Sequence, residues 1–119
     1  MSRTTLDRLR DARAHARAAL ENGGGLSPEA LAAARQPLHA VLYDLVIVGE
    51  ALGKVPAEIR GLAPTVPWRA ITGVRNAIVH AYWQIDFEIV AQVLERDLQP
   101  LIAALGQLIS ALESENGNE

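Results

Sequence analysis

The stretch from Arg75 to Tyr82 brings four side chains that could do chemistry into eight residues. It holds an arginine, an amide (Asn76), a histidine (His80) and a phenol. An arginine binds a phosphate through forked hydrogen bonds, and a histidine exchanges a proton near neutral pH. If Arg75 and His80 met over RNA, His80 could act as base or acid while Arg75 neutralised the charge on the phosphorane. Asn76 could orient His80 or bind phosphate.

The spacing of these residues limits how they can meet. On a regular helix, which turns by about 100° per residue, Arg75 and His80 diverge by about 140°. Arg75 and Tyr82, seven residues apart, share a face instead. Asn76 and His80, four residues apart, also share one. Arg75 and His80 therefore converge only if the helix distorts near Gly73 or ends near His80, or if two subunits each supply part of the site.

Outside the 75–82 stretch, the spacing of apolar residues predicts an all-α domain. Apolar residues recur at helical spacing, and no segment alternates convincingly as a strand would. Short connections favour an up-down bundle of four main helices plus short ones, and its broad apolar faces leave one side for a second copy. The expected elements are a helix over 4–21, a short helix capped by Ser27, a helix over 37–54, a turn over 57–60, a helix from Pro67 and a last helix capped by Asp86.

Two residues are expected to interrupt these helices. Gly73 would kink or break the helix that carries the 75–82 stretch. Pro100 would kink or split the last helix, because proline cannot donate a backbone hydrogen bond. We expect one domain over residues 1–112, followed by a disordered polar tail over 113–119.

Other polar residues have competing interpretations. Glu50 lies among aliphatic residues of the 37–54 helix, where a carboxylate needs a partner. Arg75 is the candidate partner, and exposure of Glu50 at the helix edge is the alternative. His15 is expected at the surface, and His39 is expected to be a packed or surface residue.

Charge is spread unevenly over a chain whose net charge is −3. Residues 1–20 and 54–85 each carry +3, residues 21–53 carry −3, and residues 86–119 carry −6. The 75–82 stretch therefore lies in a locally basic segment, although ordinary surface charge gives the same pattern. The arginines of the first helix fit a solvated face with local Asp partners better than a surface for RNA or an acidic partner.

The composition excludes several kinds of site. The chain has no cysteine, which excludes disulfides, thiolate metal sites and a cysteine nucleophile. Its three histidines and scattered acids show no zinc or magnesium spacing, so neither a metal nor a cofactor is expected. No signal peptide is visible and no apolar run approaches about 20 residues, so a cytoplasmic location is expected.

Three blocks of sequence, in order, resemble the HEPN superfamily and its HepT-type toxins. Residues 47–51 (IVGEA) resemble a run on an upstream helix of that family. Residues 66–75 (VPWRAITGVR) resemble its lead-in, with Val74 where Met is common. The spacing of arginine, histidine and tyrosine over 75–82 resembles its signature, and Asp86 resembles the acid that opens its last helix. The resemblance covers roughly residues 3–112, although residues 63–66 depart from the usual lead-in.

This resemblance implies a function and several partners. It implies the toxin of a type VII-like toxin–antitoxin system, a metal-independent RNA endonuclease with Arg75 and His80 as catalytic residues and Asn76 and Glu50 in support. The motifs of two protomers would face each other in a homodimer, and the product would carry a 2′,3′-cyclic phosphate. A minimal nucleotidyltransferase antitoxin, MntA, would silence the enzyme by AMPylation of Tyr82, an anionic adduct beside Arg75. Trp83, which follows directly, could restrict access to the phenol.

Two alternatives remain open at this point. The first is a non-catalytic HEPN module that binds a nucleotide or a protein. The second is a plain structural bundle, in which Tyr82 is a rim aromatic with its hydroxyl in water. Loss of RNA cleavage in both Arg75→Ala and His80→Ala would separate the enzyme from these alternatives.

Overall fold

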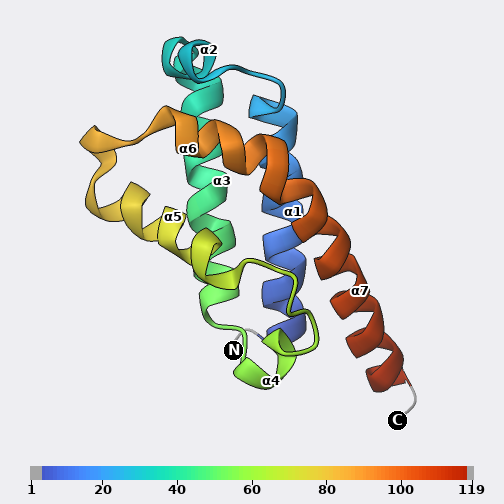
Figure 1. The fold of residues 1–119 in the computed structure, drawn as a ribbon. Helices are drawn as coiled ribbons and strands as arrows, with labels where there is room; N and C mark the ends of the chain where they lie inside the picture. Colours follow the sequence, from blue (N-terminus) through green and yellow to red (C-terminus); the bar gives the residue numbers. More distant parts are fainter. Residues whose placement is uncertain (1–3, 118–119) are drawn as a thin grey trace.

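The computed structural model describes residues 4–117 of the chain, and these residues are helical with short connections (Figure 1). No strand occurs within that range, so the predicted all-α class is confirmed. The elements are α1 (Thr5–Gly23), α2 (Pro28–Ala33), α3 (Arg35–Gly53), α4 (Ala57–Arg60), α5 (Trp68–His80), the 3₁₀ turn η1 (Tyr82–Gln84), α6 (Phe87–Gln92), the π turn η2 (Val93–Asp97) and α7 (Leu98–Gly117).

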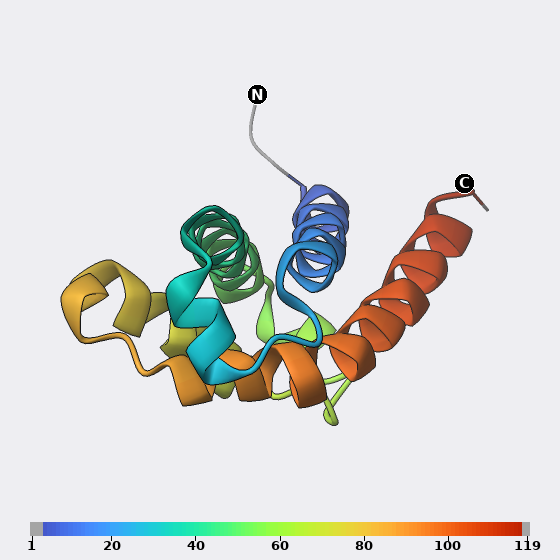
Figure 2. The ribbon, with the colours of Figure 1, turned by 90° about the horizontal axis from the view of Figure 1, so that it is seen from above.

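The four long helices pack in the order α5, α3, α1, α7. Helix α3 contacts α1 on one side and α5 on the other, and α7 packs against the far side of α1. Figure 2, seen from above, shows α5 and α7 at opposite edges of this row, with α6 and η2 crossing beneath α3 and α1. The core consists of the apolar stripes of these helices. Its largest fully buried side chains include Leu9, Leu45, Leu52, Leu98, Leu101 and Leu105.

Side-chain caps fix where several helices begin, and those at Ser27 and Asp86 confirm predictions made from the sequence. Thr4 and Asp7 form a reciprocal capping box at the start of α1. Ser27 accepts a hydrogen bond from the backbone N–H of Ala30 (3.1 Å), with Pro28 in the first turn of α2. Asp86 accepts from the N–H of Glu88 (2.9 Å) at the start of α6.

The two predicted interruptions turn out differently. Helix α5 runs without a break through Gly73, so the predicted break is absent. Burial of Ile71 and Ile78 against α3 holds the turns on either side of Gly73, and this outweighs the low helix propensity of glycine. The last helix is split, as predicted, but the irregular turn is η2, and Pro100 lies in the first turn of α7 where its missing N–H is tolerated.

The last helix extends into the segment over 113–119 that the sequence predicts to be a disordered tail. Helix α7 continues to Gly117, so the first five residues of that segment are helical. An ion pair between Arg10 and Glu113 (3.5 Å) ties this last part of α7 to α1. Residues 118–119, the remainder of the expected tail, lie outside the described residues.

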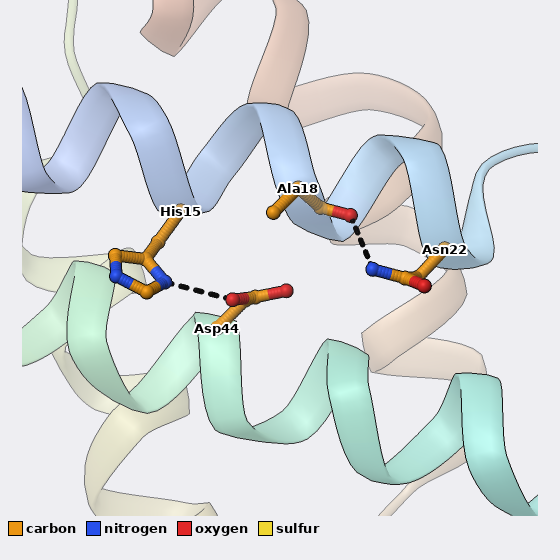
Figure 3. Close-up of polar contacts among 4 residues, drawn as sticks. All are labelled: His15, Ala18, Asn22 and Asp44. Carbon is orange, nitrogen blue, oxygen red and sulfur yellow. Dashed lines mark hydrogen bonds and ion pairs between the residues drawn. The ribbon is translucent and has the colours of Figure 1, made fainter.

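A polar pair joins α1 to α3 (Figure 3). His15 Nδ1 lies 2.8 Å from Oδ1 of Asp44, which is only 6% exposed and is the buried charged residue of the part of the chain described here. The ring of Tyr43 meets the imidazole of His15 edge-on, with 5.9 Å between the ring centroids. The expectation that His15 is a surface residue is therefore wrong, since its side chain is two-thirds buried and paired.

Candidate functional site

Close packing of α5 on α3 positions Arg75. The stem of Arg75 lies directly over Gly49, where an added Cβ would come within 2.8 Å of Arg75 Cγ and closer still to its Cβ. Real Cβ atoms essentially never approach so closely. Glycine at position 49 therefore lets the two helices approach and lays the Arg75 side chain across α3.

The guanidinium of Arg75 joins two other predicted site residues. Its Nη2 donates to Oε1 of Glu50 on α3, so Glu50 has the partner that the sequence suggested, while its side chain is also 40% exposed at the helix edge. Its Nη1 donates to Oδ1 of Asn76 (2.9 Å). Arg75 Nε is buried and has no hydrogen-bond partner among the described residues. Because each terminal nitrogen carries two N–H groups, the guanidinium still has donors for an incoming phosphate.

His80 does not meet Arg75 within this chain. It is the last residue of α5, it is exposed, and no hydrogen bond described for residues 4–117 involves its imidazole. Because α5 is continuous from Arg75 to His80, the two side chains diverge by about 140° around the helix. The helix also ends too late to bring them together, since Ala81 is the first residue to leave helical geometry.

Tyr82 lies beyond the end of α5, in the turn η1. The alignment with Arg75 that a continuous helix would give is therefore lost, because Ala81 (φ −140°, ψ 46°) turns the chain. The phenol ring instead faces His39 of α3, with 6.5 Å between the ring centroids. Tyr82 is 50% exposed even though Trp83, itself 79% exposed, follows it directly.

The residues around Arg75 line an open hollow of about 400 Å³ between α3 and α5, which we call the cationic hollow. Its charges are those of Lys54, Arg60 and Arg75 against the single carboxylate of Glu50, which makes the hollow a natural place for phosphate. Arg60 is fixed by hydrogen bonds to the carbonyls of Val55 (2.9 Å), Leu52 (3.2 Å) and Gly53 (3.0 Å) at the end of α3.

The sequence predicts no site role for five of the eight lining residues, which are Gly49, Gly53, Lys54, Arg60 and Thr72. Gly49 belongs to the IVGEA run over residues 47–51. A glycine in the middle of an apolar helix, next to Glu50, could have indicated that another helix packs closely there. Lys54 falls one turn after Glu50, so its position on the same side could have been inferred from helical spacing. Arg60 gave no local signal, because its partners are carbonyls at the end of another helix.

Two broader features complete the description. Across residues 4–117, no three His, Asp or Glu side chains are grouped so that they could hold a metal ion. No helix described here is long and apolar enough to span a membrane.

Comparison with known proteins gives consistent matches. A family model described as Ribonuclease HepT-like matches residues 6–108. A Methanocaldococcus jannaschii protein named as a candidate RNase is 26% identical over 80 residues, which make up 67% of this chain and 66% of that protein. A Thermococcus cleftensis protein named "Probable ribonuclease HepT" is 32% identical over 62 residues, or 52% of this chain and 56% of that protein.

A third relative, from Caldanaerobacter subterraneus and also named as a candidate RNase, is 30% identical over 63 residues, or 53% of this chain and 56% of its own length. The chain thus spans between about half and two-thirds of the length of these curated relatives. No solved structure gives a significant match.

Proposed function

Because the chain belongs to the HepT-like ribonuclease family, we propose that it is a metal-independent RNA endonuclease with Arg75 and His80 as its catalytic residues. The observation that carries this proposal is the arrangement of Arg75. Its guanidinium is braced by Glu50 and Asn76 and opens into the cationic hollow, as a phosphate-binding group should. Glu50 and Asn76 are positioning residues in this proposal, since they act through Arg75.

The divergence of Arg75 and His80 on one helix supports a two-subunit site. We propose a homodimer in which the 75–82 stretches of two protomers face each other, so that one RNA phosphate can meet groups from both. The exposed apolar side chains near the motif, Val79, Tyr82 and Trp83, are consistent with such a contact. A dimer would also supply two copies of His80, one to act as base and one as acid.

The reaction that follows needs only these groups. One His80 takes the proton of a ribose 2′-hydroxyl, and the oxygen attacks the adjacent phosphorus. Arg75 stabilises the extra negative charge of the phosphorane. The bond to the 5′ oxygen then breaks, and the second His80 gives a proton to that oxygen. The products are a 2′,3′-cyclic phosphate and a 5′-hydroxyl.

Cleavage of an end-labelled RNA in the presence of a chelator tests this proposal. Arg75→Ala and His80→Ala should each lower the rate at least 100-fold, because each removes a group that acts in the chemical step. Arg69→Ala is the matched control, since Arg69 is an exposed arginine of the same helix outside the hollow. Unchanged cleavage in both motif variants, with folding verified by circular dichroism, would move the assignment to a non-catalytic binding module.

Regulation is the second part of the proposal. We propose that the protein is the toxin of a type VII-like pair in the cytoplasm, silenced when a minimal nucleotidyltransferase antitoxin (MntA-like) transfers AMP to Tyr82. Half-exposure of the phenol supports access by such an enzyme. Intact mass after co-expression with the cognate nucleotidyltransferase should rise by one or more AMP units in wild type and in the control Tyr43→Phe, but not in Tyr82→Phe. Tyr43 suits the control because it is 61% exposed, against 50% for Tyr82. AMP gain in Tyr82→Phe would contradict the assignment.

A further inference from the structure

A second hollow lies between α3 and α5 and plays no part in the chemistry above. It has a volume of about 240 Å³ and is lined by His39, Leu42, Tyr43, Val46, Ile78 and Tyr82. We call it the aromatic hollow, because three of its six lining side chains are rings. Ligand pockets for drug-sized molecules usually start at about 300 Å³, so this one suits a single ring system.

The aromatic hollow and the cationic hollow are both lined by residues of α3 and α5, about one helical turn apart. On α3, Val46 lines the aromatic hollow and Glu50 lines the cationic hollow. These two residues are one helical turn apart, which is about 6 Å along the helix axis. On α5, Ile78 and Arg75 are related in the same way, about 4.5 Å apart along the axis. The lining of the groove between these two helices therefore changes from positively charged to aromatic over about one turn.

The chemistry of the aromatic hollow fits a flat heterocycle. Leu42 and Ile78 are buried and form an apolar floor, whereas Tyr43 (61% exposed) and Tyr82 (50% exposed) stand at the rim. The rings of His39 and Tyr82 are tilted by 45° and are 6.5 Å apart, so they are not stacked on each other. Rings that are exposed, unstacked and set above an apolar floor are the surfaces on which proteins stack unpaired bases.

A cation next to a ring-lined hollow at this separation matches a nucleotide, in which a phosphate and a base flank one ribose. Resting on the ribonuclease function proposed above, we propose that the aromatic hollow binds the base of the RNA nucleotide whose phosphate contacts Arg75. A base can enter only when it is unstacked and unpaired, so the substrate is single-stranded RNA. His39 and Tyr43 are base-binding residues in this assignment, and they take no part in proton transfer.

Equilibrium binding of two small probes tests the assignment without relying on cleavage. AMP carries a base and a phosphate, whereas ribose 5-phosphate carries the phosphate alone. Wild-type protein should bind AMP at least ten times more tightly than ribose 5-phosphate in isothermal titration. Tyr43→Ala and His39→Ala should each weaken AMP binding several-fold to tenfold and leave ribose 5-phosphate unchanged, because each removes one stacking surface.

Two controls separate the base site from its surroundings. Arg75→Ala should weaken the binding of both probes, since it removes the phosphate contact that they share. Leu62→Ala should weaken binding of neither probe, because Leu62 is 65% exposed and lines neither hollow. His39 and Tyr43 are exposed, but the Tyr43 ring also contacts His15, so thermal unfolding of each variant must show that the fold is intact.

Three results would overturn the inference. Equal affinity of wild-type protein for AMP and ribose 5-phosphate would show that no base is bound. An equal loss of affinity for both probes in Tyr43→Ala would show that the substitution disturbs the whole groove. Dissociation of a dimer by Tyr43→Ala with AMP binding preserved would assign the aromatic hollow to a second copy of the chain. If the protein binds AMP more tightly than ribose 5-phosphate but cleaves no RNA, the ribonuclease proposal is contradicted and the base site stands.

Discussion

The close approach of α5 to α3 makes a prediction about two glycines of the same helix. Gly49 and Gly53 lie four residues apart on α3 and both face α5. An alanine at Gly49 would place its Cβ 2.8 Å from Arg75 Cγ, while an alanine at Gly53 would meet only Thr72 Cγ2 at 3.8 Å. The first is a clash with atoms close to the backbone, and the second is ordinary van der Waals contact.

The expected effects on stability have different sizes and signs. Alanine gains up to about 1 kcal/mol over glycine within a helix, so Gly53→Ala should be neutral or slightly stabilising. Overpacking of this kind costs about 1–3 kcal/mol, and the closeness of the Gly49 contact favours the upper end. After the propensity gain is subtracted, Gly49→Ala should lose about 2 kcal/mol, which lowers the melting temperature by about 8 °C for a domain of this size.

The two substitutions should also differ in activity. Since the clash falls on the stem of Arg75, α5 must shift to relieve it, and a misplacement of about 1 Å at a reacting group can cost about 100-fold in rate. Calorimetry and RNA cleavage measured on both variants test this reasoning. A Gly49→Ala protein as stable and as active as Gly53→Ala would refute the claim that glycine at position 49 is required for the approach of the helices.

Three further predictions concern single contacts. Arg60→Ala should destabilise the protein by about 2 kcal/mol in urea unfolding, because it removes three hydrogen bonds to the end of α3 and a cation–π contact with Trp68 at 5.8 Å. His15→Ala should cost about 2 kcal/mol by leaving the buried Asp44 without its partner, whereas a double change of both to leucine should cost less. Glu50→Gln should slow RNA cleavage less than Arg75→Ala does, since glutamine keeps an acceptor for the guanidinium.

Each of these predictions has a result that would contradict it. Arg69→Ala is the control for Arg60→Ala, and equal stability of the two variants would remove the role of Arg60 at the end of α3. A double leucine variant less stable than His15→Ala would show that the polar pair is itself stabilising. Cleavage lost as completely in Glu50→Gln as in Arg75→Ala would mean that Glu50 does more than hold the arginine.

Sequence alone predicted the parts of the fold that local chemistry decides. Ser27 and Asp86 cap helices through their own neighbours, so their positions could be read directly. The pairing of Glu50 with Arg75 was one of two alternatives that the sequence left open, since a carboxylate among aliphatic residues needs a partner or lies exposed at the helix edge.

The features that sequence missed depend on contacts between distant segments. The break expected at Gly73 did not form, because burial of Ile71 and Ile78 on α3 outweighs a local preference. The bond between His15 and Asp44 joins residues 29 positions apart, and nothing near either residue signals it. Tertiary packing decided both cases, and it cannot be inferred from a local sequence pattern.

One face of α5 has no neighbour within the domain. Arg69, Gly73, Asn76 and His80 follow one another along this outer row, and all four are exposed, while Trp68, Ile71 and Ile78 on the opposite row are buried. Substitutions on the outer row therefore place no demand on the core. In a saturation screen scored separately for abundance and for RNA cleavage, the inner row should fail in both measures. The outer row should keep its abundance, so that any position lost there in cleavage is one that holds Arg75, as Asn76 does, or one required for contact with RNA or with a second subunit.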